Sequence, residues 1–294
     1  MTGTPPSAGT ADALKAKVKA WLDGEGYPFE LRIGRELSAR GWSASHAVYF
    51  QDLRTRKPRQ IDIAAWKLFN PLDDGRGIHV ELAIECKHAG GQVWVVFSSD
   101  AELSEKSSPS MYTPGWIGQT VLSYYEFSGS ARQPLEWLNL APARGHGIVR
   151  AMIKRTRGRA GARLDQAFAA VRTAISAAEA RADELGTVIH ADVFDIIGPT
   201  VCLPVVLFNG PLFDYRIDTD GTETLTEIGS ARLVAPTPGD AQSMRVVNVV
   251  TPPALHDFLR RVERDIANLL DAVAPEWETL MSELKSQAGA RQAR

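Results

Sequence analysis

Two short apolar segments of this chain each carry an acid, and this feature most constrains the fold. Residues 60–69 contain Asp62 among aliphatic side chains, and residues 80–87 contain Glu85 near their end. Short runs of β-branched and aliphatic residues bounded by turn residues are typical of strands. Because an unpaired charge is costly to bury, acids in such strands indicate a polar site at the surface of a sheet.

The alternation of side chains along a strand groups the polar residues of the second segment. Glu85 and Lys87 are two apart and project together, while Cys86 points to the other face. If the two strands pair, Asp62 joins them, and two carboxylates and one amine share a surface. Mg²⁺ takes oxygen ligands, so this is a candidate cation site. We expect these groups in one cleft, with Ile84 and Cys86 buried on the far face.

A third acid lies upstream, in residues 27–42, which have the pattern of a helix begun by a proline and ended by a glycine. Glu30 lies in its first turn. This order of helix acid, strand acid and Glu-x-Lys resembles the PD-(D/E)xK, or restriction-endonuclease-like, nuclease superfamily, in its Mrr-like and Holliday-junction-resolvase-like branch. The resemblance covers roughly residues 27–98. One departure is Ile61, where the family name places proline.

The resemblance implies an α/β fold in which helices flank a mixed central sheet, and a Mg²⁺- or Mn²⁺-dependent endonuclease that hydrolyses phosphodiester bonds, above all in DNA. By the same resemblance, Asp62, Glu85 and the Cys86 carbonyl would bind the metal. Lys87 would orient water or stabilise charge on the phosphate, and Glu30 would position water or a second ion.

Each of these residues also has a simpler explanation. The helix dipole alone favours an acid such as Glu30 in a first turn. Asp62 has Arg59 and Lys67 as alternative partners, and Glu85 and Lys87 have the spacing of a surface ion pair. A nuclease-like fold without catalysis, acting as a nucleic-acid-binding or protein-assembly module, therefore remains an alternative.

The composition bounds the class of protein. A chain of 294 residues with 44% hydrophobic and 23% charged residues is typical of a globular protein. There is no apolar run of membrane-spanning length and no signal-peptide core. Two cysteines, Cys86 and Cys202, form neither a disulfide framework nor a zinc-site spacing. We expect a cytoplasmic protein without membrane contact, and a homodimer or a partner protein remains open.

Two basic clusters stand out against the net charge of −2. Residues 138–164 contain no acid, and the candidate nucleic-acid-binding residues there are Arg150, Lys154, Arg155, Arg157 and Arg159. The second cluster precedes the Asp62 strand and consists of Arg54, Arg56, Lys57 and Arg59. Phosphate contacts supply most non-specific affinity for nucleic acid, and these clusters offer them. A solvated surface loop is the alternative for the first cluster.

The domain organisation predicted is a disordered segment, 1–10, followed by one elaborated domain, 11–294. Its parts are a core of residues 27–98 and 160–218, an insertion of residues 99–159 and a C-terminal extension of residues 219–294. Further helices are predicted over residues 11–21, 161–185 and 253–273, and further strands over 47–50, 93–97, 201–208, 212–217, 222–234 and 244–250. Asn209-Gly210 predicts a hairpin, Pro204 an edge or a bulge, and the apolar segment 93–97 a strand buried on both faces.

Overall fold

The structure, a computed structural model, describes residues 8–69, 78–99, 145–151, 166–188 and 200–274. Its helices are α1 (Ala8–Glu25), α2 (Tyr27–Ala39), α4 (Gln166–Val188), the 3₁₀ turn η2 (Pro252–Ala254) and α5 (Leu255–Val273). Its strands are β1 (Ser43–Gln51), β2 (Pro58–Phe69), β3 (Ile78–His88), β4 (Val93–Ser98), β5 (Gly145–Ala151), β6 (Thr200–Asn209), β7 (Leu212–Ile217), β8 (Glu223–Glu227), β9 (Ser230–Thr237) and β10 (Asp240–Val250).

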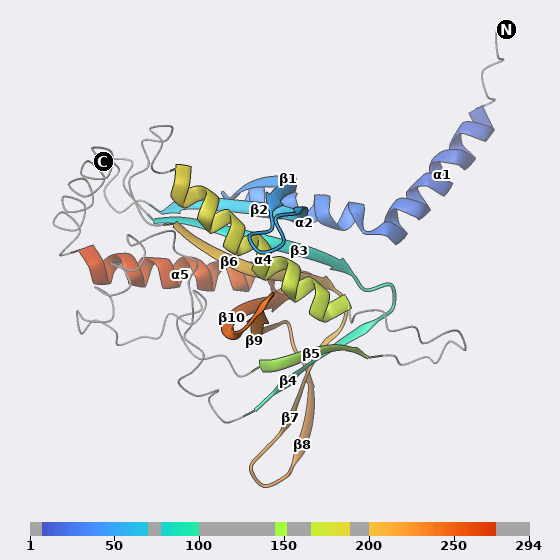
Figure 1. Cartoon of the computed structure of the whole chain (residues 1–294). Coiled ribbons are helices and arrows are strands. Elements are labelled where there is room, and N and C mark those ends of the chain that lie inside the picture. The colour runs from blue at the N-terminus through green and yellow to red at the C-terminus, as the bar shows by residue number, and fades with distance from the viewer. Residues whose placement is uncertain (1–7, 70–77, 100–144, 152–165, 189–199, 275–294) are drawn as a thin grey trace.

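All of these strands belong to one mixed sheet in the order β1-β2-β3-β6-β10-β9-β5-β4-β7-β8 (Figure 1). The sheet has antiparallel pairs such as β1–β2 and β2–β3 and parallel pairs such as β3–β6. The predicted α/β class with a mixed sheet is therefore confirmed. Strands from the predicted core, insertion and extension share this sheet. No helix in the described part of the chain is long and apolar enough to cross a membrane.

Two apolar cores cover the two faces of the sheet. On one face, α2 and α5 pack through residues such as Phe29, Ile33 and Phe258. On the other face, α4 packs through an alanine-rich side with residues such as Ala170 and Ala174. Figure 1 shows α4 crossing over β3 and β6. We call these the α2/α5 face and the α4 face. β3 and β6 lie between both cores, so nearly all of their residues are buried.

The helix that carries Glu30 begins and ends where glycines permit. Gly26, with φ 89°, precedes the first turn of α2, and Pro28 lies within that turn. Gly41, with φ 77°, follows the last turn, and its left-handed backbone stops the helix as predicted. The buried side of α2 includes Ile33 and Leu37, so this side of the helix faces the core.

The predicted hairpin at Asn209–Gly210 is wrong, because β6 and β7 do not pair. β6 lies between β3 and β10, whereas β7 lies between β4 and β8. The cause lies beside the turn. Pro211 has no N–H to continue an antiparallel ladder, and its carbonyl accepts the N–H of Trp94 at 3.1 Å, which directs the next strand to β4.

Other predictions need correction as well. Pro204 lies in an inner strand rather than at an edge, opposite Ala83 of β3, and the pairing of β6 with β10 begins only at Val205. In β4, only Trp94 and Val96 are buried, so the strand is covered on one side rather than on both. α1 begins at Ala8, inside the segment predicted to be disordered.

The strands predicted from the sequence did not include β5, which lies in the predicted insertion and pairs with β4 and β9. A Cβ on Gly145 would lie 2.8 Å from the carbonyl oxygen of Arg232, so glycine permits the close approach of β5 to β9. Residues 100–144 and 152–159 of that insertion lie outside the described residues.

Candidate active site

The candidate site lies where the ladder between β2 and β3 stops. The last pair is Ile63 with Ile84, and Asp62 comes directly beyond it on β2. The backbone N–H of Cys86 donates a hydrogen bond to Oδ2 of Asp62 at 2.7 Å. The Asp62 side chain thus replaces a backbone partner of β3 and holds a carboxylate against the strand that carries Glu85.

A twist in β1 and β2 produces this position. Ile61 packs on the α4 face and Ile63 on the α2/α5 face, although residues two apart in a regular strand share one face. On β1, His46 pairs with Ile63 and Val48 pairs with Ile61. Ala47, between them, lies at the level of Asp62 and has φ 53°. Such a backbone is uncommon for a residue with a Cβ. Asp62 therefore lies between the two cores, at the end of the ladder.

Glu85 and Lys87 contact each other at the end of β3. Nζ of Lys87 lies 2.5 Å from Oε1 of Glu85 and 3.2 Å from the backbone oxygen of Cys86. Ile84 and Cys86 are buried in the α2/α5 core, as the alternation predicted. Ala83 packs in the opposite core, so Glu85 and Lys87 project on the α4 side.

Glu30 reaches the site from α2. The start of this helix packs on the end of β3, where a Cβ added to Gly26 would lie 3.4 Å from Cβ of His88. Partial burial raises the pKa of Glu30, the charge of Asp62 raises it further, and Lys87 opposes both. The structure therefore brings the four residues predicted from the sequence, on three elements, into one electrostatically coupled group.

Burial governs the protonation of this group. It raises the pKa of Glu85 to about 7, against the attraction of Lys87 and with help from the charge of Asp62. Burial lowers the pKa of Lys87, but the charges of Glu85 and Asp62 more than reverse this, so the pKa is raised and the side chain stays an ammonium. Burial also raises the pKa of the Cys86 thiol well above its usual range, which argues against a thiolate nucleophile.

The simpler ion pairs considered for Asp62 are not formed. Arg59 contacts Asp52, with its Nε 2.9 Å from Oδ2 of that residue. Lys67 contacts Glu263, with Nζ 2.9 Å from Oε1. Both alternatives for Asp62 are therefore wrong.

The donor set fits a hard divalent cation. Carboxylates of Asp62 and Glu85 and the Cys86 carbonyl are oxygen ligands of the kind that Mg²⁺ and Mn²⁺ prefer. The Lys87 ammonium already lies against two of these three groups, which marks the position as one that holds positive charge. Among the described residues, no group of three or more His, Cys, Asp or Glu side chains is placed to hold a metal ion. Backbone and water oxygens would have to complete the coordination.

The basic clusters have different outcomes. Arg150 lies on β5, with Nη1 3.4 Å from Oε1 of Gln166, whereas Lys154, Arg155, Arg157 and Arg159 lie outside the described residues. In the second cluster, Arg54 and Arg59 line a pocket beside α4 that also includes Arg172. Arg172 was not predicted from the sequence, because no local pattern distinguishes it from any other exposed residue of a helix.

Comparison with known proteins adds no family assignment. No family model, no curated protein and no solved structure matches this chain. The function is therefore inferred from the chemistry of the site.

Proposed function

We propose that this protein is a metal-dependent nuclease that hydrolyses phosphodiester bonds in DNA, with a restriction-endonuclease-like core. The observation that supports this most is the gathering of Glu30, Asp62, Glu85 and Lys87 at the end of the β2–β3 ladder. Acids and an ammonium in this arrangement can hold a divalent ion and a phosphate side by side.

The roles follow from the protonation and contacts of each group. Asp62, Glu85 and the Cys86 carbonyl would hold the ion, which when bound polarises the scissile phosphate and lowers the pKa of a water molecule. Lys87 remains protonated, so it stabilises negative charge on the phosphate rather than accepting a proton. Glu30, with its raised pKa, orients water near the phosphate.

The protonation of Glu85 predicts how metal affinity depends on pH. With a pKa of about 7, the carboxyl is mostly neutral at pH 6 and mostly ionised at pH 8. A ligand must lose its proton to bind a cation. We therefore expect apparent Mn²⁺ affinity to fall by up to about tenfold for each pH unit below 7. Titration calorimetry at pH 6, 7 and 8 measures this, and equal affinities at all three would contradict the assignment of Glu85.

One observation favours a second candidate, a nuclease-like module that binds nucleic acid or a protein without turnover. The Lys87 ammonium already satisfies Glu85 and the Cys86 carbonyl, so part of the acidic charge is compensated without an ion. Titration calorimetry separates the two candidates. Salt-sensitive DNA binding with no Mg²⁺ or Mn²⁺ binding would favour the module.

Cleavage assays on the wild-type chain test the proposed function. Supercoiled plasmid, linear duplex DNA and RNA are each incubated with Mg²⁺, with Mn²⁺ and with EDTA. We expect cleavage of DNA with either ion and none in EDTA, because the phosphate and the water are both activated at the ion. Cleavage that continues in EDTA is incompatible with the proposal.

A further inference from the structure

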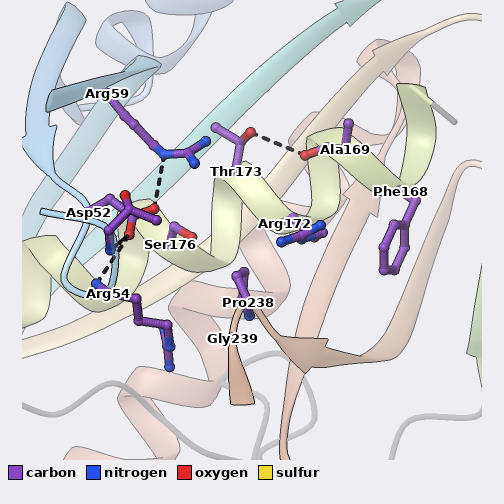
Figure 2. A pocket seen from close by; sticks show the side chains of 11 residues that line it. Asp52, Arg54, Arg59, Phe168, Ala169, Arg172, Thr173, Ser176, Pro238 and Gly239 are labelled. Atoms are coloured by element: carbon purple, nitrogen blue, oxygen red, sulfur yellow. Dashed lines mark hydrogen bonds and ion pairs between the residues drawn. The ribbon is translucent and has the colours of Figure 1, made fainter. Parts of the chain in front are cut away.

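A pocket of about 340 Å³ lies on the α4 face, formed by three segments far apart in the sequence (Figure 2). These segments are the turn between β1 and β2, the first half of α4, and the turn between β9 and β10. Among the lining residues that the structure describes, three are arginines, Arg54, Arg59 and Arg172, and one is a carboxylate, Asp52. We call it the arginine pocket. Its volume lies within the range of roughly 300–1,000 Å³ typical of small-ligand sites.

Asp52 organises the pocket and stays ionised. Burial tends to raise its pKa, but hydrogen bonds from Thr55 and Arg54 and the charge of Arg59 outweigh this and lower it. Its ion pair uses Nε of Arg59 at 2.9 Å, as the dashed line in Figure 2 shows. The pair leaves the terminal nitrogens of the Arg59 guanidinium for another acceptor.

The other side of the pocket supplies further donors. The exposed Arg172 lies on α4, with its guanidinium carbon 5.9 Å from the centre of the Phe168 ring, which helps to orient it. Arg54 is anchored by both carboxylate oxygens of Glu179. Thr55, Thr173 and Ser176, which carry hydroxyl groups, also line the pocket. Planar guanidinium groups bind phosphate in a bidentate manner, so this donor set suits a phosphate group.

The arginine pocket lies near the candidate active site and on the same side of the sheet. Arg59 precedes Asp62 by three residues on β2, which corresponds to roughly 10 Å of strand. Arg59 is two residues from Ile61, so both lie on the α4 face. Glu85 and Lys87 project toward the same face. Two places this close can contact neighbouring phosphates of one nucleic-acid backbone.

We propose that the arginine pocket binds a phosphate group of the nucleic-acid backbone, close to the phosphate that contacts Lys87. The donors argue for a phosphate by themselves. Its assignment to nucleic acid rests on the proposed nuclease function. The other source of the same chemistry is a free phosphorylated small molecule.

The test is Arg172→Gln, an exposed change that leaves the Arg59–Asp52 pair intact. The matched control is Arg264→Gln, also an exposed arginine, on α5 at the opposite face. Binding of a fluorescent DNA duplex is measured by anisotropy over a range of NaCl concentrations, in EDTA so that no cleavage occurs. In parallel, inorganic phosphate and a nucleoside monophosphate are titrated by calorimetry.

We expect Arg172→Gln to weaken DNA binding roughly three- to tenfold at low salt and to make the salt slope shallower by about 0.9, with the control unchanged. Loss of phosphate and nucleotide binding with normal DNA binding would overturn the assignment to nucleic acid and identify a free phosphorylated ligand. Unchanged binding of every ligand would overturn the phosphate site itself. Because EDTA removes metal-dependent cleavage, this binding test is independent of catalysis. A protein that cleaves no DNA can still show the phosphate site, and an active nuclease can still lack it.

Discussion

Replacement of Lys87 by methionine is expected to lower the rate of DNA cleavage on the order of 10²–10³-fold, because it removes a preorganised charge from the developing phosphate charge. Nζ of Lys87 contacts Glu85 and the Cys86 carbonyl, and its raised pKa keeps it charged. Methionine keeps an unbranched apolar side chain, so the packing of the stem is largely preserved.

The same variant should separate catalysis from metal binding. The ammonium competes with a cation for the Glu85 and Cys86 oxygens, so its removal should leave Mn²⁺ affinity equal or higher once the pH is high enough to ionise Glu85 in both proteins. That pH is higher for the variant, because the loss of Lys87 raises the pKa of Glu85 further. The matched control is Lys67→Met, since Lys67 is also ion-paired, with 29% of its side chain exposed compared with 32% for Lys87. The control should keep the wild-type rate. Full activity of Lys87→Met would contradict the role given to this residue.

The second large effect concerns a buried ion pair below α4. The side chain of Glu81 on β3 is only 1% exposed, and Arg181 of α4 binds it through two hydrogen bonds of 2.6 and 3.1 Å. Arg181→Met should lower the free energy of unfolding by about 3–5 kcal/mol, because it leaves a buried carboxylate without its counter-ion. Urea denaturation followed by circular dichroism measures the loss.

A double-mutant cycle makes this prediction specific. Glu81→Leu alone should cost less, because Arg181 is more exposed and still pairs with Glu184 at 2.5 Å. The double variant Glu81→Leu/Arg181→Met should recover most of the stability lost in Arg181→Met, since an apolar pair of similar volume suits this core. If the double variant is as unstable as Arg181→Met, the loss comes from packing rather than from the unpaired charge.

Local patterns in the sequence were enough to predict the gathering of the candidate residues. Glu30 lies in the first turn of a helix bounded by glycines, and Glu85 and Lys87 lie two apart on a strand. Each position depends on a periodicity that a short segment defines by itself. The pairing of the Asp62 strand with the Glu85 strand follows from their proximity along the chain.

Features that depend on distant partners were not predictable in this way. β6 reads locally as one arm of a hairpin, but it pairs with β3 and β10, and the two cores bury its apolar residues on both faces. The twist at Ala47 has no sequence signal, since the residue there is not a glycine. The arginine pocket joins the turn before β2 to Arg172 on α4, and only the packing of α4 on the sheet brings them together.

The most direct test of the central claim compares wild-type protein with the double variant Asp62→Ala/Lys87→Ala in plasmid cleavage with Mg²⁺. Asp62 lies at the end of the β2–β3 ladder and Lys87 on the adjoining strand, so the two changes remove a proposed metal ligand and the proposed phosphate cation. We predict that the wild type converts supercoiled plasmid to nicked or linear DNA and that the folded double variant does not. Cleavage by the double variant at the wild-type rate would contradict the assignment of this site.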